Sequence, residues 1–132
     1  MLKFNELQEG NLVMAEYEGQ QWEGVVEELN REDKEVAVQT EVQQFWFTPE
    51  HLYPIVLTEE YLFKLGFTKE ILADGKLKYL KEAFRMVVPD NGKLSPLEIW
   101  YREDHRLLAK PLYVHELQNH YYDMTKVELN AV

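Results

Sequence analysis

The segment Tyr113–Met124 has the most regular pattern in the chain, and this pattern constrains what the other residues must form. At about 100° per residue, one narrow stripe of a helix collects Val114, Leu117, Tyr121 and Met124. The other side carries polar groups, namely His115, Glu116, Asn119 and Asp123. An amphipathic helix must bury its apolar stripe against other elements. We therefore expect a helix at residues 113–124 and a sheet elsewhere in the chain that covers it.

Side chains with an apolar body and a polar tip flank this stripe. Tyr113 lies on one side of it, and Gln118 and Tyr122 lie on the other. Such groups either pack against neighbouring strands or bind a partner. For partner binding, we expect contact through His115, Gln118, Asn119 and Tyr122 on the exposed side of the helix. Replacing Gln118 and Tyr122 by Ala is then expected to abolish partner binding and to leave the fold intact.

The composition is that of a folded globular protein. Hydrophobic residues make up 45% of the 132 positions, charged residues 29% and aromatic residues 13%, which indicates order throughout. The absence of cysteine excludes disulfides, thiolate metal sites and cysteine nucleophiles. The first ten residues do not resemble a signal peptide, and no apolar run approaches the roughly 18 residues that a membrane helix needs. We expect a cytoplasmic protein that does not enter a membrane.

The net charge of −10 is concentrated near the N-terminus. Residues 1–57 hold twelve acidic residues against Lys3, Arg31 and Lys34, a net charge of −9, whereas residues 58–132 have a net charge of −1. DNA and RNA are polyanions that proteins bind by neutralising phosphates. Direct nucleic-acid binding is therefore disfavoured for the N-terminal part.

From residue 11 to residue 57 the sequence predicts short strands separated by turns. The strands are expected at residues 12–17, 21–29, 35–42 and 43–48, followed by a helical turn at 49–54 and a last strand at 55–57. In the third strand, Val36, Val38, Thr40 and Val42 are expected to face inward, and Glu35, Ala37, Gln39 and Glu41 to face water. In the fourth, Phe45 and Phe47 share one face and Trp46 has the other. Five short strands with one helical turn before the last resemble a small SH3-like barrel.

Three aromatic residues of this region have two alternative roles. SH3-like barrels usually bind peptides, RNA or modified side chains, and the acidic sequence favours peptides or cations here. Tyr17, Trp22 and Trp46 would then form an aromatic recess for a cation. Alternatively, they complete the core and cover the edges of the barrel.

The remaining residues predict an α+β unit. In Thr58–Phe67, a short helix has Thr58 as its N-cap, Gly66 as its left-handed C′ residue, and Phe67 folded back on Leu62. Helical spacing and strand-like residues compete at 76–84, where we predict strands, with a hairpin turn at 89–92. Further strands are expected at 97–101 and 106–110, before the closing helix. The fold class is α+β and mostly β, with domains at residues 1–57 and 58–132.

Two stretches resemble a family of small uncharacterised proteins of gut bacteria and of the phages and mobile elements that infect them. They are Ile55–Phe67 and Tyr113–Thr125. The family pattern usually continues with glycine where this chain has Lys126, so the end of the helix stays open; Thr125 and Glu128 would alternatively start another turn. The resemblance implies a phage or prophage context and brings no established activity or catalytic residue.

The polar residues do not form a pattern that indicates catalysis. Glu116 and His120 have the i, i+4 spacing of a metal pair, but the sequence offers no third ligand nearby. Ser95 lacks the glycine-framed turn that presents a serine nucleophile, and no phosphate-binding loop is present. We predict no metal, no cofactor and no enzymatic activity.

The sequence therefore predicts a non-enzymatic module that binds a protein partner. Its contact surface is expected on the closing helix, with Trp46 on the barrel as a second candidate. The alternative is an acidic DNA mimic that occupies the nucleic-acid groove of a host protein. Either role is compatible with the cytoplasm of the host cell or with a phage particle.

Overall fold

The computed structural model describes all 132 residues, and it confirms an α+β fold that is mostly β. The strands form two five-stranded antiparallel sheets. The chain divides into two compact units: the first contains Met1–Val56 and Tyr113–Asn119, and the second contains Leu57–Leu112 and His120–Val132. The predicted domains, residues 1–57 and 58–132, differ from these units because Tyr113–Asn119 lies with the first.

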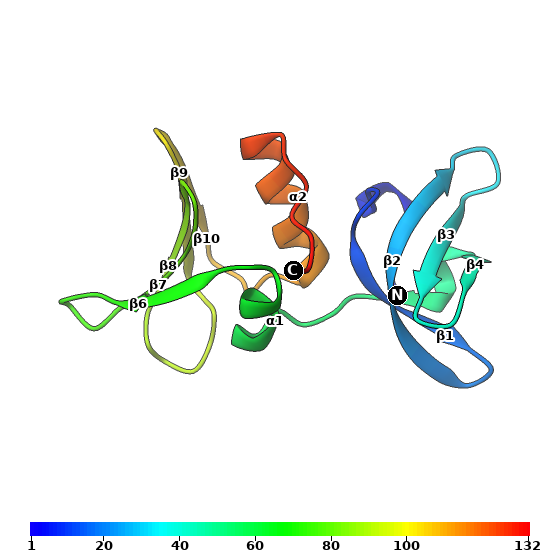
Figure 1. Cartoon of the computed structure of the whole chain (residues 1–132), viewed down its shortest axis with the longest axis horizontal. Helices are drawn as coiled ribbons and strands as arrows, with labels where there is room; N and C mark the ends of the chain where they lie inside the picture. Colours follow the sequence, from blue (N-terminus) through cyan, green and yellow to red (C-terminus); the bar gives the residue numbers. More distant parts are fainter. The chain divides into compact units, whose positions relative to one another are not determined.

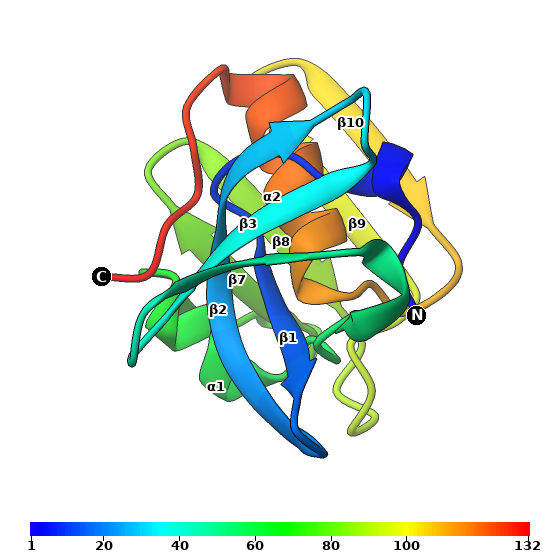
Figure 2. The same ribbon diagram turned by 90° about the vertical axis from the view of Figure 1, so that its right-hand side faces the viewer.

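The first unit is built on a sheet with the strand order β4-β3-β2-β1-β5. Its elements are η1 (Phe4–Glu6), β1 (Leu12–Tyr17), β2 (Gln20–Asn30), β3 (Glu35–Thr40), β4 (Gln44–Phe47), η2 (Pro49–His51) and β5 (Leu52–Tyr53), where η marks a 3-10 turn. Figure 1 shows these strands in blue to green, and Figure 2 shows β1, β2 and β3 side by side as twisted ribbons. The 3-10 turn η2 lies within the helical turn predicted at residues 49–54.

The last strand of this sheet lies earlier than predicted. The prediction of a strand at residues 55–57 is wrong. The last strand, β5, consists of Leu52 and Tyr53, which pair with β1. Pro54 follows directly and has no backbone N–H to continue the ladder. Beyond it, Val56 makes only an isolated bridge to Tyr113.

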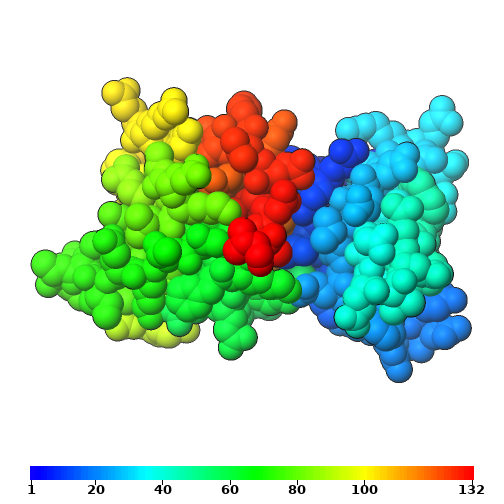
Figure 3. Space-filling model, in the orientation of Figure 1, coloured from blue at the N-terminus to red at the C-terminus, as the bar shows by residue number.

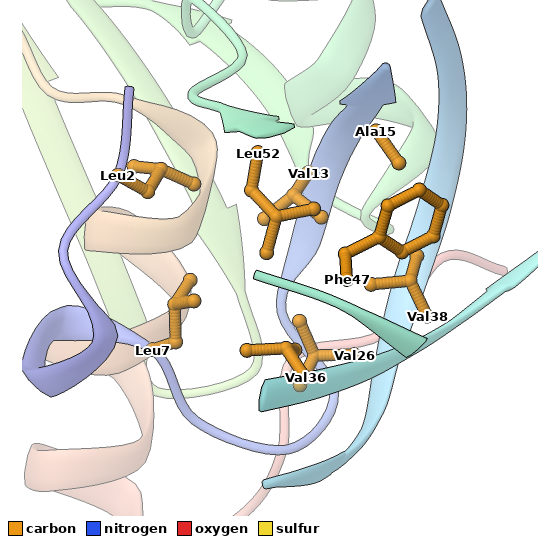
Figure 4. Packing of buried hydrophobic residues seen from close by; sticks show 9 residues of the cluster. All are labelled: Leu2, Leu7, Val13, Ala15, Val26, Val36, Val38, Phe47 and Leu52. Atoms are coloured by element: carbon orange, nitrogen blue, oxygen red, sulfur yellow. The ribbon is translucent and has the colours of Figure 1, made fainter. Parts of the chain in front are cut away.

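The core of the first unit is a cluster of buried aliphatic side chains and one phenylalanine (Figure 4). Leu2 and Leu7 reach it from the N-terminal segment. The strands supply the other members, Val13, Ala15, Val26, Val36, Val38, Phe47 and Leu52. The predicted burial of Val36, Val38 and Thr40 is therefore confirmed.

Two positions of the predicted alternation in β3 are wrong. Val42 is exposed because the strand ends at Thr40, whose hydroxyl accepts hydrogen bonds from the N–H groups of Val42 and Gln43. Ala37 is fully buried, although it shares a face with Glu28 and Trp46, its partners on the adjacent strands. Cross-strand partners lie side by side, so two long side chains flank its methyl group.

The second unit has a sheet with the strand order β10-β9-β8-β7-β6. Its elements before the closing helix are α1 (Glu59–Lys64), β6 (Thr68–Ile71), β7 (Leu77–Lys81), β8 (Phe84–Val88), β9 (Leu97–Tyr101) and β10 (Asp104–Leu108). Strands rather than a helix at residues 76–84 are therefore confirmed. The last strand begins two residues earlier than predicted, because Arg102 takes a left-handed backbone conformation (φ 55°) and closes a shorter turn.

Both predicted caps of α1 are present. The N–H of Tyr61 donates to the Thr58 hydroxyl (3.3 Å), and Gly66 has a φ of 93°. The N–H of Phe67 donates to the carbonyl of Leu62, and that of Gly66 to Phe63, both at 3.0 Å. These two bonds form a Schellman motif, which satisfies carbonyl groups that the end of a helix otherwise leaves free.

The sheet of the second unit is joined to its helical segments by aromatic rings and one buried hydroxyl. The Phe84 ring lies 6.0 Å from Phe67 and 4.7 Å from Tyr121. The Tyr79 hydroxyl donates to the Glu59 carboxylate (2.7 Å), which also accepts from Lys69 (2.6 Å). Hydrogen bonds from Lys69 and then Tyr79 hold the pKa of Glu59 below its ordinary value, whereas burial, together with this bond, raises the pKa of Tyr79.

The closing helix, α2 (Val114–Thr125), ends without the glycine that often terminates a helix. Lys126 instead takes the left-handed conformation itself, with a φ of 63°, and its N–H donates to the carbonyl of Tyr122 (2.8 Å). This is the single-bond left-handed cap. The alternative of another turn starting at Thr125 is wrong, because no helix follows Lys126.

Replacing Lys126 by Gly is expected to stabilise the protein by about 1 kcal/mol, because glycine adopts the left-handed conformation without the steric cost of a Cβ atom. Urea unfolding followed by circular dichroism measures the change. Lys126→Ala is the control, since it removes the charged side chain and keeps the Cβ atom. A glycine variant no more stable than the alanine variant would contradict the cap assignment.

Candidate binding site

The predicted contact residues on α2 do not share one exposed surface. His115 and Gln118 are only 1% and 4% exposed, and Asn119 is half-buried. Tyr122 is 42% exposed and belongs to the second unit. The expectation that His115 and Gln118 lie on the exposed side of the helix is therefore wrong.

Gln118 is buried because its side-chain amide binds the backbone at the start of β1. Its Oε1 atom accepts from the N–H of Leu12 (2.8 Å), and its Nε2 atom donates to the carbonyl of Gly10 (2.9 Å). Buried backbone groups need hydrogen-bond partners, and here one side chain provides two of them. Gln118 is thus part of the framework of the first unit.

Asn119 binds the same N-terminal segment. Its Nδ2 atom donates to the carbonyl of Glu6 (3.0 Å), and its Oδ1 atom accepts from the side chain of Asn11 (2.9 Å). His115 lies beside it on the helix, with Nε2 3.1 Å from the Glu6 carboxylate. We refer to the hydrogen bonds of Gln118 and Asn119 with residues 6–12 as the amide clamp.

The predicted aromatic recess is present in part. Tyr17 and Trp22 line a recess of about 230 Å³, together with Glu18, Gln20, Thr40, Val42, Phe45 and Phe47. Trp46 instead lines a neighbouring recess of about 310 Å³, with Glu16, Tyr17, Glu18, Gly19, Phe45, Phe47 and His51. Figure 3 shows the segment that carries β3 and β4, in cyan, at the surface of this unit.

A stacked pair of rings lines both recesses. The centroids of Tyr17 and Phe45 are 5.1 Å apart at an interplanar angle of 22°, and Phe47 meets Phe45 edge-on at 6.2 Å and 72°. Tyr17 ends β1 and Phe45 lies on β4, strands that are not adjacent in the sheet, so the sheet curves enough to bring them together. Tyr17 and Trp46 are each 46% exposed. We call Tyr17, Phe45 and Trp46 the aromatic surface.

Sequence reasoning missed Phe45 as a site residue. The predicted alternation placed Phe45 only on the same face as Phe47, opposite Trp46, and in the structure Phe45 is half-buried. The available signal was its place beside the exposed Trp46 on a short strand without charges. Its partner Tyr17 is 28 positions away, and only the folded sheet shows that the two rings stack.

The net charge lies on the same unit as the aromatic surface. The first unit holds thirteen acidic residues against three basic ones, a net charge of −10, and in the second unit eleven acidic residues balance eleven basic ones. Glu18 lines both recesses, and Glu16 lines the one that contains Trp46. The aromatic surface therefore lies in a negative field that attracts cations.

No cluster of three or more histidine, aspartate or glutamate side chains is placed to hold a metal ion. Neither helix has the length and apolar character needed to cross a membrane.

Comparisons with protein-family models, with curated proteins and with solved structures found no match.

Gln118→Ala is expected to lower the free energy of unfolding by about 1–3 kcal/mol, because it leaves two backbone groups without their partner. The Leu12 amide should also lose protection against hydrogen exchange. Tyr122→Ala, which truncates an exposed side chain on the same helix, should change stability by no more than about 0.5 kcal/mol. Equal effects of the two variants would refute the amide clamp.

Proposed function

We propose that the protein is a non-enzymatic protein-interaction module of phage or prophage origin, which contacts its partner through the aromatic surface. The observation that carries the proposal is the exposure of Tyr17 and Trp46 beside two recesses. Tyrosine, tryptophan and phenylalanine are enriched at protein interfaces, where a few aromatic anchors supply most of the binding energy. A recess beside such rings can accept an anchor side chain of the partner.

This proposal moves the contact surface from α2 to β1 and β4. His115, Gln118 and Asn119 make contacts within the first unit, so binding a partner through them would break the amide clamp and the contact between His115 and Glu6. Trp46 keeps the role predicted for it, and Tyr17 joins it. Tyr122 is exposed but does not belong to the aromatic surface, so its substitution is a control for binding.

Affinity capture from the native host, with and without prophage induction, tests the proposal. The tagged protein should retain a stoichiometric partner, and Tyr17→Ala/Trp46→Ala should weaken its retention by more than about tenfold. Phe63→Ala/Tyr122→Ala is the matched control, since these two aromatic residues are 46% and 42% exposed in the second unit. Retention of the partner by both double variants would contradict the aromatic surface.

The charge distribution favours one alternative, an acidic DNA mimic that inhibits a nucleic-acid-binding protein. Its specific support is the net charge of −10 on the first unit. Salt separates the two functions: a mimic releases a basic partner early in a salt gradient and competes with DNA, whereas a contact anchored by aromatic rings persists to high salt. A phage structural protein among the retained partners would indicate a role in the particle, and a host protein a role in the infected cell.

A further inference from the structure

We propose that the recess lined by Tyr17, Trp22, Phe45 and Phe47 binds an alkylated ammonium group, such as the side chain of a methylated lysine on the partner protein. This inference rests on the proposed function, and it names the chemical group that the aromatic surface receives. Three features of the recess support it: its aromatic lining, its charge and its shortage of hydrogen-bond acceptors.

The lining offers several aromatic rings to one ligand group. Tyr17 is exposed and Trp22 and Phe45 are half-buried, so these three rings are open to a ligand, whereas Phe47 is only 6% exposed and meets Phe45 edge-on at 72°. Tyr17 stacks on Phe45, so each of these two rings has one face left for a ligand, and Trp22 is the third open ring of the lining. The faces of aromatic rings attract cations, with tryptophan the strongest, and several rings around one cation add their contributions.

The charge near the recess has the sign that a cation requires. Glu18 is exposed and lines the recess, and Glu16 lines the adjacent one. The three basic residues of the first unit, Lys3, Arg31 and Lys34, do not line either recess. A neutral apolar ligand would gain nothing from this field, whereas a cation gains from both the rings and the carboxylates.

The recess has few acceptors for N–H groups. The polar residues of the lining are Tyr17, Glu18, Gln20 and Thr40. The Thr40 hydroxyl already accepts from the N–H groups of Val42 and Gln43, both at 3.3 Å. A guanidinium has five N–H donors and an unmodified ammonium has three, and donors buried without acceptors are costly. A fully alkylated ammonium has none, so it matches this lining best.

The test is an NMR titration of the full-length chain with a Gly/Ser peptide that carries one trimethyllysine. Cross-peaks of Tyr17, Trp22 and Phe45 should shift on binding. A peptide with the neutral isostere, in which a tert-butyl group replaces trimethylammonium, should bind about tenfold more weakly, because it keeps the shape and loses the charge. Peptides with unmodified lysine or arginine should also bind more weakly.

Two variants and one control tie the binding to the recess. Tyr17→Leu removes a ring and keeps apolar volume, and Glu18→Gln removes the charge; each should weaken binding of the trimethyllysine peptide by several-fold to tenfold. Both residues are exposed, so the fold should tolerate the changes. Tyr122→Leu on the second unit should have no effect on binding.

Three results would overturn the inference. The first is that the neutral isostere or the arginine peptide binds at least as tightly as the trimethyllysine peptide. The second is that none of the peptides binds at millimolar concentration. The third is that free choline binds as tightly as the trimethyllysine peptide. The last result would assign the recess to a small quaternary ammonium compound. If the inference fails and Tyr17→Ala/Trp46→Ala still abolishes partner capture, the proposed function stands and only the ligand class is wrong.

Discussion

The amide clamp is the interaction on which the first unit depends. Gln118 satisfies one N–H and one carbonyl at the start of β1, and Asn119 holds the carbonyl of Glu6. These bonds fix residues 6–12, the segment that carries Leu7 into the core and leads into β1. A buried backbone group without a partner costs about as much as a strong core contact, so the fold requires these particular amides at these positions.

The aromatic surface follows from the curvature of the sheet. Tyr17 and Phe45 come from β1 and β4, and their stacking requires the sheet to bend until these strands approach each other. Phe47 belongs to the core of this unit and Phe45 packs against it, whereas Tyr17 and Trp46 are each 46% exposed. The acidic residues of the same unit support the proposed binding of a cation, because charge selects among ligands that the rings alone would accept equally.

The sequence was sufficient to predict elements whose signals are local. The caps of α1 at Thr58 and Gly66 depend on neighbours within one turn, and the strands at 76–84 follow from the residues that precede the turn at Pro89. The roles of polar side chains on α2 were not predictable in this way. Helical periodicity places Gln118 beside the apolar stripe of the helix. It does not show that Gln118 is buried, because the backbone groups that its side chain binds lie more than 100 positions away. The recess was predicted only in outline for the same reason, since the stacking of Phe45 on Tyr17 is a long-range contact.

The most direct test of this account compares residues 1–57 alone with the full chain by ¹H–¹⁵N NMR. If Tyr113–Asn119 is part of the first unit, the isolated segment lacks the amide clamp and its spectrum should show the narrow dispersion of an unfolded chain. The full chain, which contains residues 113–119, should give the dispersed spectrum of a folded protein, with slow exchange of the Leu12 amide. Native cross-peaks from residues 1–57 alone, at the stability of the full chain, would contradict the account.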